Sequence, residues 1–172
     1  MLSSKTVFII GAGASVHLQF PSGLDLTRAI SHIFRGLQST SDGAAEDVRL
    51  FRTALGAYEA ANISGNGFLR YIEDASNRFA DSLFYESSID NFINRNREDK
   101  NAVVACKIAI SLLISQAEVN SQLFRRTTPN HVPTINDDDW LTKLYRKLGE
   151  KVVASNRDSL FDNVSFITFN YD

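Results

Sequence analysis

The chain has 172 residues, of which 44% are hydrophobic and 22% charged, and its formal net charge is −2. These values are ordinary for a globular protein of about one domain, and they exclude a disordered chain, a collagen and a coiled-coil rod. A slightly acidic chain lacks the excess positive charge that nucleic-acid binding uses, so we expect no nucleic-acid partner. The single cysteine, Cys106, excludes a disulfide framework and a four-cysteine zinc module within the chain, and we expect no metal.

Two short apolar runs, one near each end, predict strands of a parallel sheet. Thr6 to Ile10 (TVFII) and Val164 to Phe169 (VSFITF) are apolar without alternation. Such runs are typical of strands that are buried on both faces. Gly11 stops the first run, and Asn170-Tyr171-Asp172 follows the second.

Helical spacing of apolar residues fills most of the chain between these runs. The predicted helices cover residues 24–37, 48–58, 68–79, 88–96, 99–123 and 141–152. Ser87 or Ser88 suits the N-cap of the fourth, Asp99 that of the fifth, and Asp137 or Asp138 that of the sixth. Residues 125–138 have the composition of a surface loop.

No secretory signal is expected, because only five apolar residues follow Lys5 before the chain reaches Gly11. The longest apolar stretch, residues 102–114, is too short to span a bilayer and carries Lys107, which favours a buried helix. We therefore expect a cytoplasmic protein with no membrane partner.

These elements predict an α/β fold, but two strands do not make a stable α/β domain. Two interpretations remain open. Either further short strands lie among the helices, or the chain is truncated after the strand that ends in Asn170-Tyr171-Asp172.

A glycine-rich segment, Gly11-Ala12-Gly13-Ala14-Ser15, follows the first strand and precedes a helix. In this context backbone N–H groups can face a phosphate or a ribose. Gly11 would allow a tight turn, Gly13 would let a ligand approach the backbone, and Ser15 would donate a hydroxyl to a phosphate or cap a helix. Val16 stands where the ordinary dinucleotide fingerprint has its third glycine, which disfavours an ordinary Rossmann dehydrogenase. A plain tight turn without a ligand is the alternative.

Two further segments carry candidate residues. Pro21 and Gly23 lie where the first long helix is expected to begin. A turn followed by a helix start explains both residues without a ligand. Asn170 and Asp172 follow the last strand, and ligands of open parallel sheets bind outside the carboxyl ends of strands. If the two strands are neighbours, the glycine segment and this Asn-Tyr-Asp segment face one crevice. A plain turn is again the alternative.

Taken together, GAGAS at residues 11–15, Pro21 with Gly23, and TFNYD at residues 168–172 resemble the sirtuin superfamily. The Asn-Tyr-Asp form is similar to the bacterial sirtuin-like branch found in antiphage defence proteins. The resemblance implies a Rossmann-like parallel sheet of the sirtuin type, with a large helical insertion at about residues 45–155. Residues 1–172 would then be the N-terminal part of one NAD-binding domain.

The resemblance also implies an activity, namely hydrolysis of NAD at the bond between nicotinamide and ribose, with NAD depletion as an antiphage defence. It places Gly11, Ala12, Gly13 and Ser15 at the phosphates and adjoining ribose, with Pro21 and Gly23 in the segment that follows. Asn170 would be catalytic, holding the nicotinamide-side ribose and orienting water, and Asp172 would support the NAD site. The implied partners are NAD, a further domain of a longer protein, another copy of the chain and a phage-derived activator.

Departures from the family pattern keep other functions open. The family's catalytic His follows the Asn motif, whereas His17, His32 and His131 precede it and match no family position, so we expect residues 1–172 alone to be inactive. Leu24-Asp25-Leu26 stands where the family continues into an Arg. The alternatives are a non-catalytic nucleotide-binding sensor or oligomerisation module, and an NAD-dependent protein deacylase, which usually carries the four-cysteine zinc module.

Overall fold

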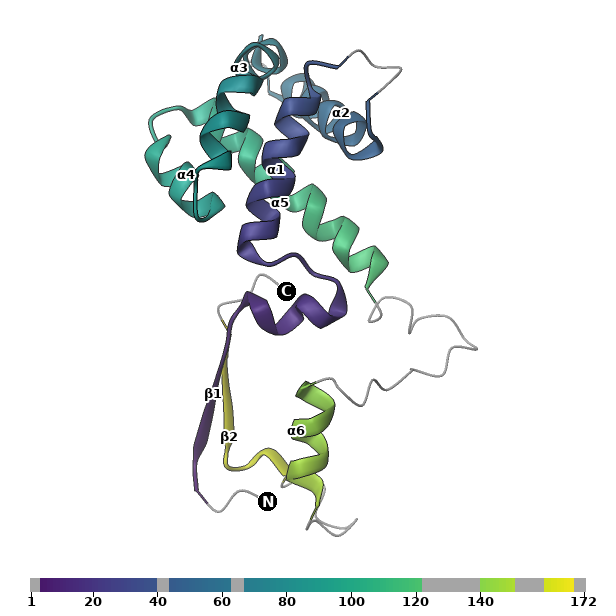
Figure 1. The fold of residues 1–172 in the computed structure, drawn as a ribbon, viewed down its shortest axis with the longest axis vertical. Coiled ribbons are helices and arrows are strands. Elements are labelled where there is room, and N and C mark those ends of the chain that lie inside the picture. The colour runs from purple at the N-terminus through teal and green to yellow at the C-terminus, as the bar shows by residue number, and fades with distance from the viewer. Residues whose placement is uncertain (1–3, 40–43, 63–66, 122–139, 151–159, 169–172) are drawn as a thin grey trace, which may run out of the picture. The chain divides into compact units, whose positions relative to one another are not determined.

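The structure is a computed structural model, and it describes residues 4–39, 44–62, 67–121, 140–150 and 160–168. Over these residues the chain is mixed α/β and mostly helical, with one two-stranded parallel sheet. The chain divides into two compact units (Figure 1). Unit 1 comprises residues 1–20 and 120–172, and unit 2 comprises residues 21–119.

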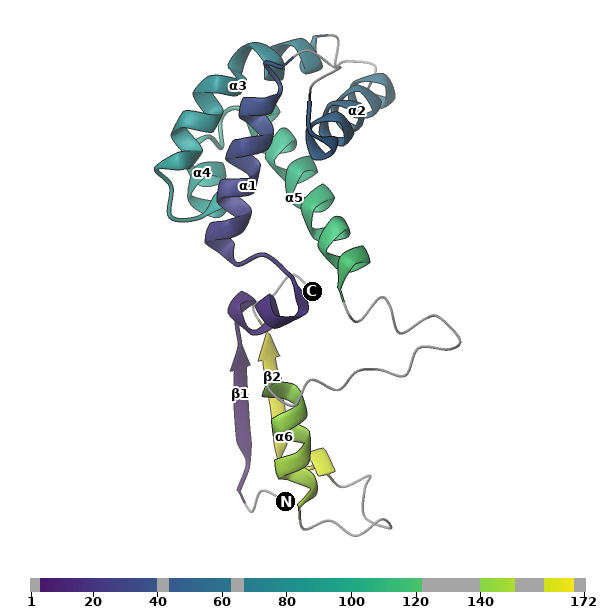
Figure 2. The same cartoon turned by 45° about the vertical axis from the view of Figure 1, so that its right-hand side comes forward.

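Unit 1 contains the sheet. Strands β1 (Thr6–Ile10) and β2 (Val164–Thr168) pair in parallel, with Thr6 opposite Val164 and Ile10 opposite Thr168. The rings of the register partners Phe8 and Phe166 stack with their centroids 5.6 Å apart. A 3₁₀ helix, η1 (Ala12–Leu18), follows β1, and α6 (Trp140–Gly149) lies alongside β2 in both ribbon views (Figures 1 and 2). The predicted α/β class is confirmed, and the two strands are neighbours, which the sequence had left as a condition.

Burial of the strands differs from the prediction. Val7 is 54% exposed and Ile9 is 72% exposed, and on β2 Phe166 and Ile167 are 43% and 47% exposed. The expectation of strands buried on both faces was wrong over the described residues, because burial requires a layer packed on each face of the sheet. No strand besides β1 and β2 occurs in the described part of the chain, so that part contains no hidden strand among the helices.

Unit 2 is helical. Its elements are α1 (Gly23–Gly36), α2 (Glu46–Ala61), α3 (Phe68–Phe84), α4 (Ile89–Arg95) and α5 (Lys100–Asn120). The predicted helices are confirmed, although α5 ends at Asn120 rather than near residue 123. The insertion expected at about residues 45–155 overlaps unit 2, whereas α6 belongs to unit 1.

The core of unit 2 is built on aromatic side chains that contact one another edge to face. Phe34 of α1 meets Phe51 of α2 and Phe79 of α3, with ring centroids 5.4 and 5.6 Å apart, and Phe79 meets Phe92 of α4 at 5.9 Å. Such pairs stabilise a core by about 0.5–1.5 kcal/mol beyond the area they bury. These contacts join four helices around one cluster.

Capping fixes where three of these helices begin. The hydroxyl oxygen of Ser22 accepts a hydrogen bond from the Asp25 N–H at 3.2 Å, and that of Ser88 accepts one from the Asn91 N–H at 3.3 Å. The carboxylate of Asp99 accepts one from the Ala102 N–H at 3.0 Å. Ser88 is therefore the cap of α4, and the prediction for Asp99 is confirmed. Asp137 and Asp138 lie outside the described residues.

Helix α5 meets the core through small side chains. Ala102, Ala105, Cys106 and Ala109 are buried in the cluster, whereas its large aliphatic side chains are only partly buried or exposed. By length and composition, α5 is the one described helix that qualifies as a membrane span, and 22% of its most apolar window is buried. The prediction of a buried helix is confirmed only for the alanine-rich face. The expectation that this segment is too short to span a bilayer was wrong by length, because α5 extends beyond residues 102–114 at both ends.

Candidate functional site

The parallel register brings the carboxyl ends of β1 and β2 to one edge of the sheet. Ile10, the last residue of β1 before Gly11, lies opposite Thr168, the last residue of β2. This is the edge at which open parallel sheets bind ligands. Asn170 and Asp172 lie outside the described residues, so their roles stay predictions.

The two glycines after β1 have no structural requirement for glycine among the described residues. Gly11 has φ −107° and ψ 172°, which is extended backbone that any residue adopts, and Gly13 does not have a positive φ either. A Cβ atom built at Gly11 or at Gly13 would meet no atom within 4 Å. The backbone conformation at Gly11 is therefore one that other residues can also adopt. Among the described residues, none fills the space next to either glycine.

The segment after the glycines forms a 3₁₀ helix that the sequence did not predict. The Ala14 N–H donates to the Gly11 carbonyl at 2.9 Å, and the Gln19 N–H donates to the Val16 carbonyl at 3.0 Å. Gln19 ends η1 in the left-handed conformation, with φ 74°. Ser15 is buried within η1 rather than placed at its N-cap, which is Gly11. Ala12, also predicted to bind the ligand, is the first residue of η1.

Trp140 contacts η1, and the sequence analysis did not predict this contact. Its indole Nε1 donates a hydrogen bond to the Ala14 carbonyl at 3.0 Å, which ties the first residue of α6 to η1 within unit 1. Trp140 is the chain's only tryptophan. Being the single tryptophan is a signal that could have drawn attention to Trp140, but it does not indicate which residue Trp140 contacts.

Pro21 and Gly23 begin unit 2, and the structure gives them a role in starting α1. Ser22 between them caps the helix, and Gly23 is its first residue, with no atom within 4 Å of an added Cβ. Pro21 is partly buried. The cap at Ser22 therefore explains Pro21 and Gly23 as parts of a helix start, without a ligand.

The described histidines lie in helices. His17 lies in η1 and is partly buried, His32 is exposed on α1, and His131 lies outside the described residues. Within the described ranges no group of three or more His, Cys, Asp or Glu side chains comes together.

Two described groups in unit 2 have raised pKa values, and the Asp99 carboxylate contributes to both shifts. A hydrogen bond from the Tyr71 hydroxyl to the Asp99 carboxylate raises the pKa of Tyr71, with burial adding to the effect. Burial raises the pKa of the Cys106 thiol to about 12, and the Asp99 charge adds to it. A protonated, buried thiol is a poor nucleophile, so Cys106 is not a candidate for covalent catalysis.

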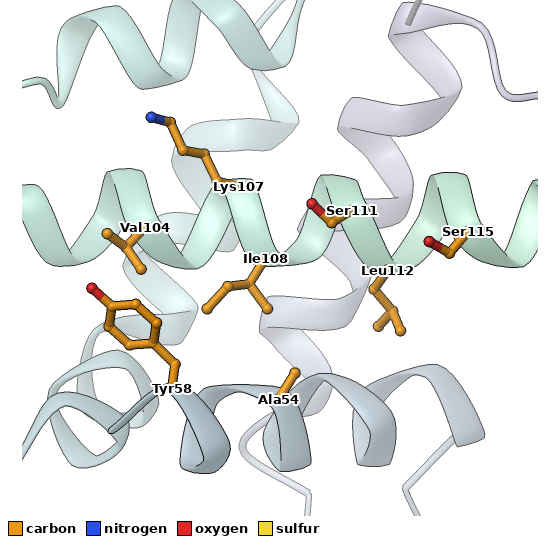
Figure 3. Close-up of a pocket in the computed structure, with 8 residues that line it drawn as sticks. All are labelled: Ala54, Tyr58, Val104, Lys107, Ile108, Ser111, Leu112 and Ser115. Atoms are coloured by element: carbon orange, nitrogen blue, oxygen red, sulfur yellow. The ribbon is translucent and has the colours of Figure 1, made fainter. Parts of the chain in front are cut away.

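An apolar groove of about 520 Å³ runs between α2 and α5, wholly within unit 2 (Figure 3). Val104, Ile108 and Leu112 of α5 point toward α2, from which Ala54 and Tyr58 project. Lys107, Ser111 and Ser115 of α5 complete the lining. The groove contains none of the residues predicted to bind NAD.

Comparison of the chain with protein-family models, with curated proteins and with solved structures finds no match. The sirtuin-like assignment therefore depends on the motifs at residues 11–15, 21–23 and 168–172. The structure contributes the arrangement of the strands that precede the first and the last of these motifs.

Proposed function

We propose that this chain carries the nucleotide-binding sheet edge of a sirtuin-like NAD hydrolase, a cytoplasmic effector that depletes NAD in bacterial antiphage defence. The observation that carries the proposal is the register of β1 and β2. Ile10 opposite Thr168 brings the carboxyl ends of both strands to the same edge of the sheet. In the sequence these two strands directly precede the glycine segment and the Asn-Tyr-Asp segment, and open parallel sheets bind ligands at this edge.

The glycines support the same proposal. Neither backbone conformation nor packing within the described residues explains Gly11 or Gly13. A side chain at either position would extend into open space, and a ligand that lies against the backbone is a reason to keep that space free. In the proposal this ligand is the diphosphate of NAD, held at Gly11, Ala12 and Gly13 with Ser15 nearby.

The chemistry would be departure of nicotinamide through an oxocarbenium-like state, followed by capture of the ribose by water. Asn170 would hold the nicotinamide-side ribose and orient the water, since an amide offers both a donor and an acceptor. Asp172 would support the same half of the site. The protein would act by positioning and by electrostatic stabilisation of the transition state.

Binding is tested first with Gly13→Val in residues 1–172, by titration calorimetry with NAD. No described residue lies within 4 Å of the added Cβ, so the variant should fold while the space of the phosphates is filled. We expect NAD affinity to fall at least tenfold. Gly56→Val is the matched control, because Gly56 also has open space and lies in α2. Unchanged affinity in folded Gly13→Val would contradict the placement of the phosphates.

Catalysis is tested by measuring free nicotinamide released from NAD by the full-length protein that the gene encodes. Asn170→Ala should abolish release with little loss of stability, whereas Asn101→Ala, at an exposed position in the first turn of α5, should leave it unchanged. Normal turnover by Asn170→Ala would show that the motif assignment is wrong.

A second candidate is a nucleotide sensor that binds NAD without cleaving it. The position of the histidines favours this alternative, because the family's catalytic His follows the Asn motif, whereas the described histidines, His17 in η1 and His32 in α1, precede it. NAD binding that Gly13→Val abolishes, without nicotinamide release by the full-length wild-type protein, would identify the sensor.

A further inference from the structure

The exposed face of α5 carries a regular pattern of polar residues that takes no part in the core of unit 2. Lys107, Ser111, Ser115 and Glu118 recur every three or four residues, and all four side chains are exposed. They form a narrow polar stripe opposite the buried alanines. Beside the stripe, the partly buried Val104, Ile108 and Leu112 form one wall of the groove toward α2 (Figure 3).

The stripe carries two opposite charges, one in each half of the helix. Lys107 lies five residues before Leu112, and Glu118 lies five residues after Leu113. Neither charge has an ion pair within the described residues. A helix with this pattern is complementary to a second copy of itself that runs in the opposite direction.

We propose that α5 is a self-association surface, on which α5 of a second copy lies antiparallel and fills the groove between α2 and α5. The two-fold axis passes between Leu112 and Leu113, so Lys107 of each copy faces Glu118 of the other. Such an interface uses the same patch on both copies, as two-fold dimers do. The groove-lining residues of α2, Ala54 and Tyr58, form its outer wall in each copy.

Side-chain size favours this occupant. Ser111 and Ser115 lie near the proposed axis, and small side chains at a helix crossing let two helices approach closely. The apolar wall of Val104, Ile108 and Leu112 would lose its contact with water, which supplies the driving force. Antiparallel helix dipoles and two reciprocal ion pairs would fix the direction.

The test is a charge exchange followed by sedimentation equilibrium of residues 1–172 over a wide range of concentrations. Lys107→Glu alone and Glu118→Lys alone place like charges opposite each other twice per dimer. Each should weaken dimerisation by roughly tenfold. The double variant, Lys107→Glu with Glu118→Lys, restores both attractive pairs and should dimerise like the wild type. All substituted positions are exposed, so circular dichroism should show unchanged helix content.

Lys100→Glu is the matched control, because Lys100 is exposed on the same helix but would lie beyond the end of the second copy's α5. It should leave dimerisation unchanged. A monomeric wild type at every concentration would overturn the proposal, and so would a double variant as weak as the single ones. Binding of a monomeric wild type to phosphatidylcholine vesicles would assign the apolar wall to lipid instead.

Discussion

The indole N–H of Trp140 donates a hydrogen bond to the carbonyl oxygen of Ala14, across 126 residues of sequence. Ala14 directly follows Gly13 in η1, and Trp140 begins α6. The bond therefore fixes the segment after β1 to the helix that lies alongside β2. In the proposed function, this contact holds the glycine segment in the position that NAD requires.

Trp140→Phe should weaken NAD binding several-fold. The substitution keeps an aromatic ring but leaves the Ala14 carbonyl without this donor, which should also lower the free energy of unfolding by about 1 kcal/mol. Binding calorimetry and urea unfolding measure the two effects. Tyr145→Phe is the control, because Tyr145 lies on the same helix and is 57% exposed. Wild-type affinity in Trp140→Phe would show that the glycine segment is held without this bond.

Alanine at two helical glycines should change stability in opposite directions. At Gly36 the added Cβ would lie 2.5 Å from Cγ2 of the buried Val48, so Gly36→Ala should lower the free energy of unfolding by about 1–2 kcal/mol. At Gly56 no atom lies within 4 Å, so Gly56→Ala should raise it by about 0.5–1 kcal/mol through helix propensity. Urea unfolding of both variants measures the contrast. Stabilisation by both would mean that α2 shifts to accommodate the new methyl group.

The parts of the fold that the sequence predicted depend on local patterns. The helical stripe of Ile30 and Phe34 and the caps Ser88 and Asp99 involve residues within one or two turns of each other. Strand burial was not predictable from TVFII, because exposure of Val7 and Ile9 depends on what packs against the sheet rather than on the strand itself.

At the candidate site, too, local features were predictable from the sequence and long-range contacts were not. The position of Gly11 and Gly13 directly after a strand follows from the apolar run that precedes them. The contact between Trp140 and Ala14 joins residues that no local pattern connects, so only the structure reveals it. The 3₁₀ helix was missed because AGASVHL lacks the periodic apolar residues that indicate a helix.

Arg52→Ala should cost far more stability than Arg70→Ala. The Arg52 guanidinium donates to Glu73 Oε1 at 3.0 Å and to the Leu37 carbonyl at 2.7 Å, which links α2, α3 and the end of α1. We expect a loss of about 1–3 kcal/mol, because these two acceptors and the Ser39 carbonyl, at 3.3 Å, lose a charged donor. Arg70 is 86% exposed and lies 3.9 Å from Asp74, so its loss should stay within about 0.5 kcal/mol.

Thermal and urea unfolding of the two arginine variants compare these costs directly. Arg52→Lys should recover only part of the loss, because an ammonium group lacks the planar fork that reaches both acceptors. Equal losses for Arg52→Ala and Arg70→Ala would show that the link between the three helices contributes no more than a surface ion pair.

The Cys106 thiol should make stability depend on pH in the alkaline range. Burial raises its pKa from 9.0 to about 12, so unfolding exposes a thiol that releases its proton more readily. The protonated thiol's contribution to the free energy of unfolding is fully present below pH 9. It is lost as the pH rises toward 12, at about 1.4 kcal/mol per pH unit. Urea unfolding of wild type and Cys106→Ala at a series of pH values isolates it from the titration of tyrosine and lysine. The wild-type free energy of unfolding should fall more steeply, and parallel curves for the two proteins would mean that the thiol ionises in the folded chain as it does in water.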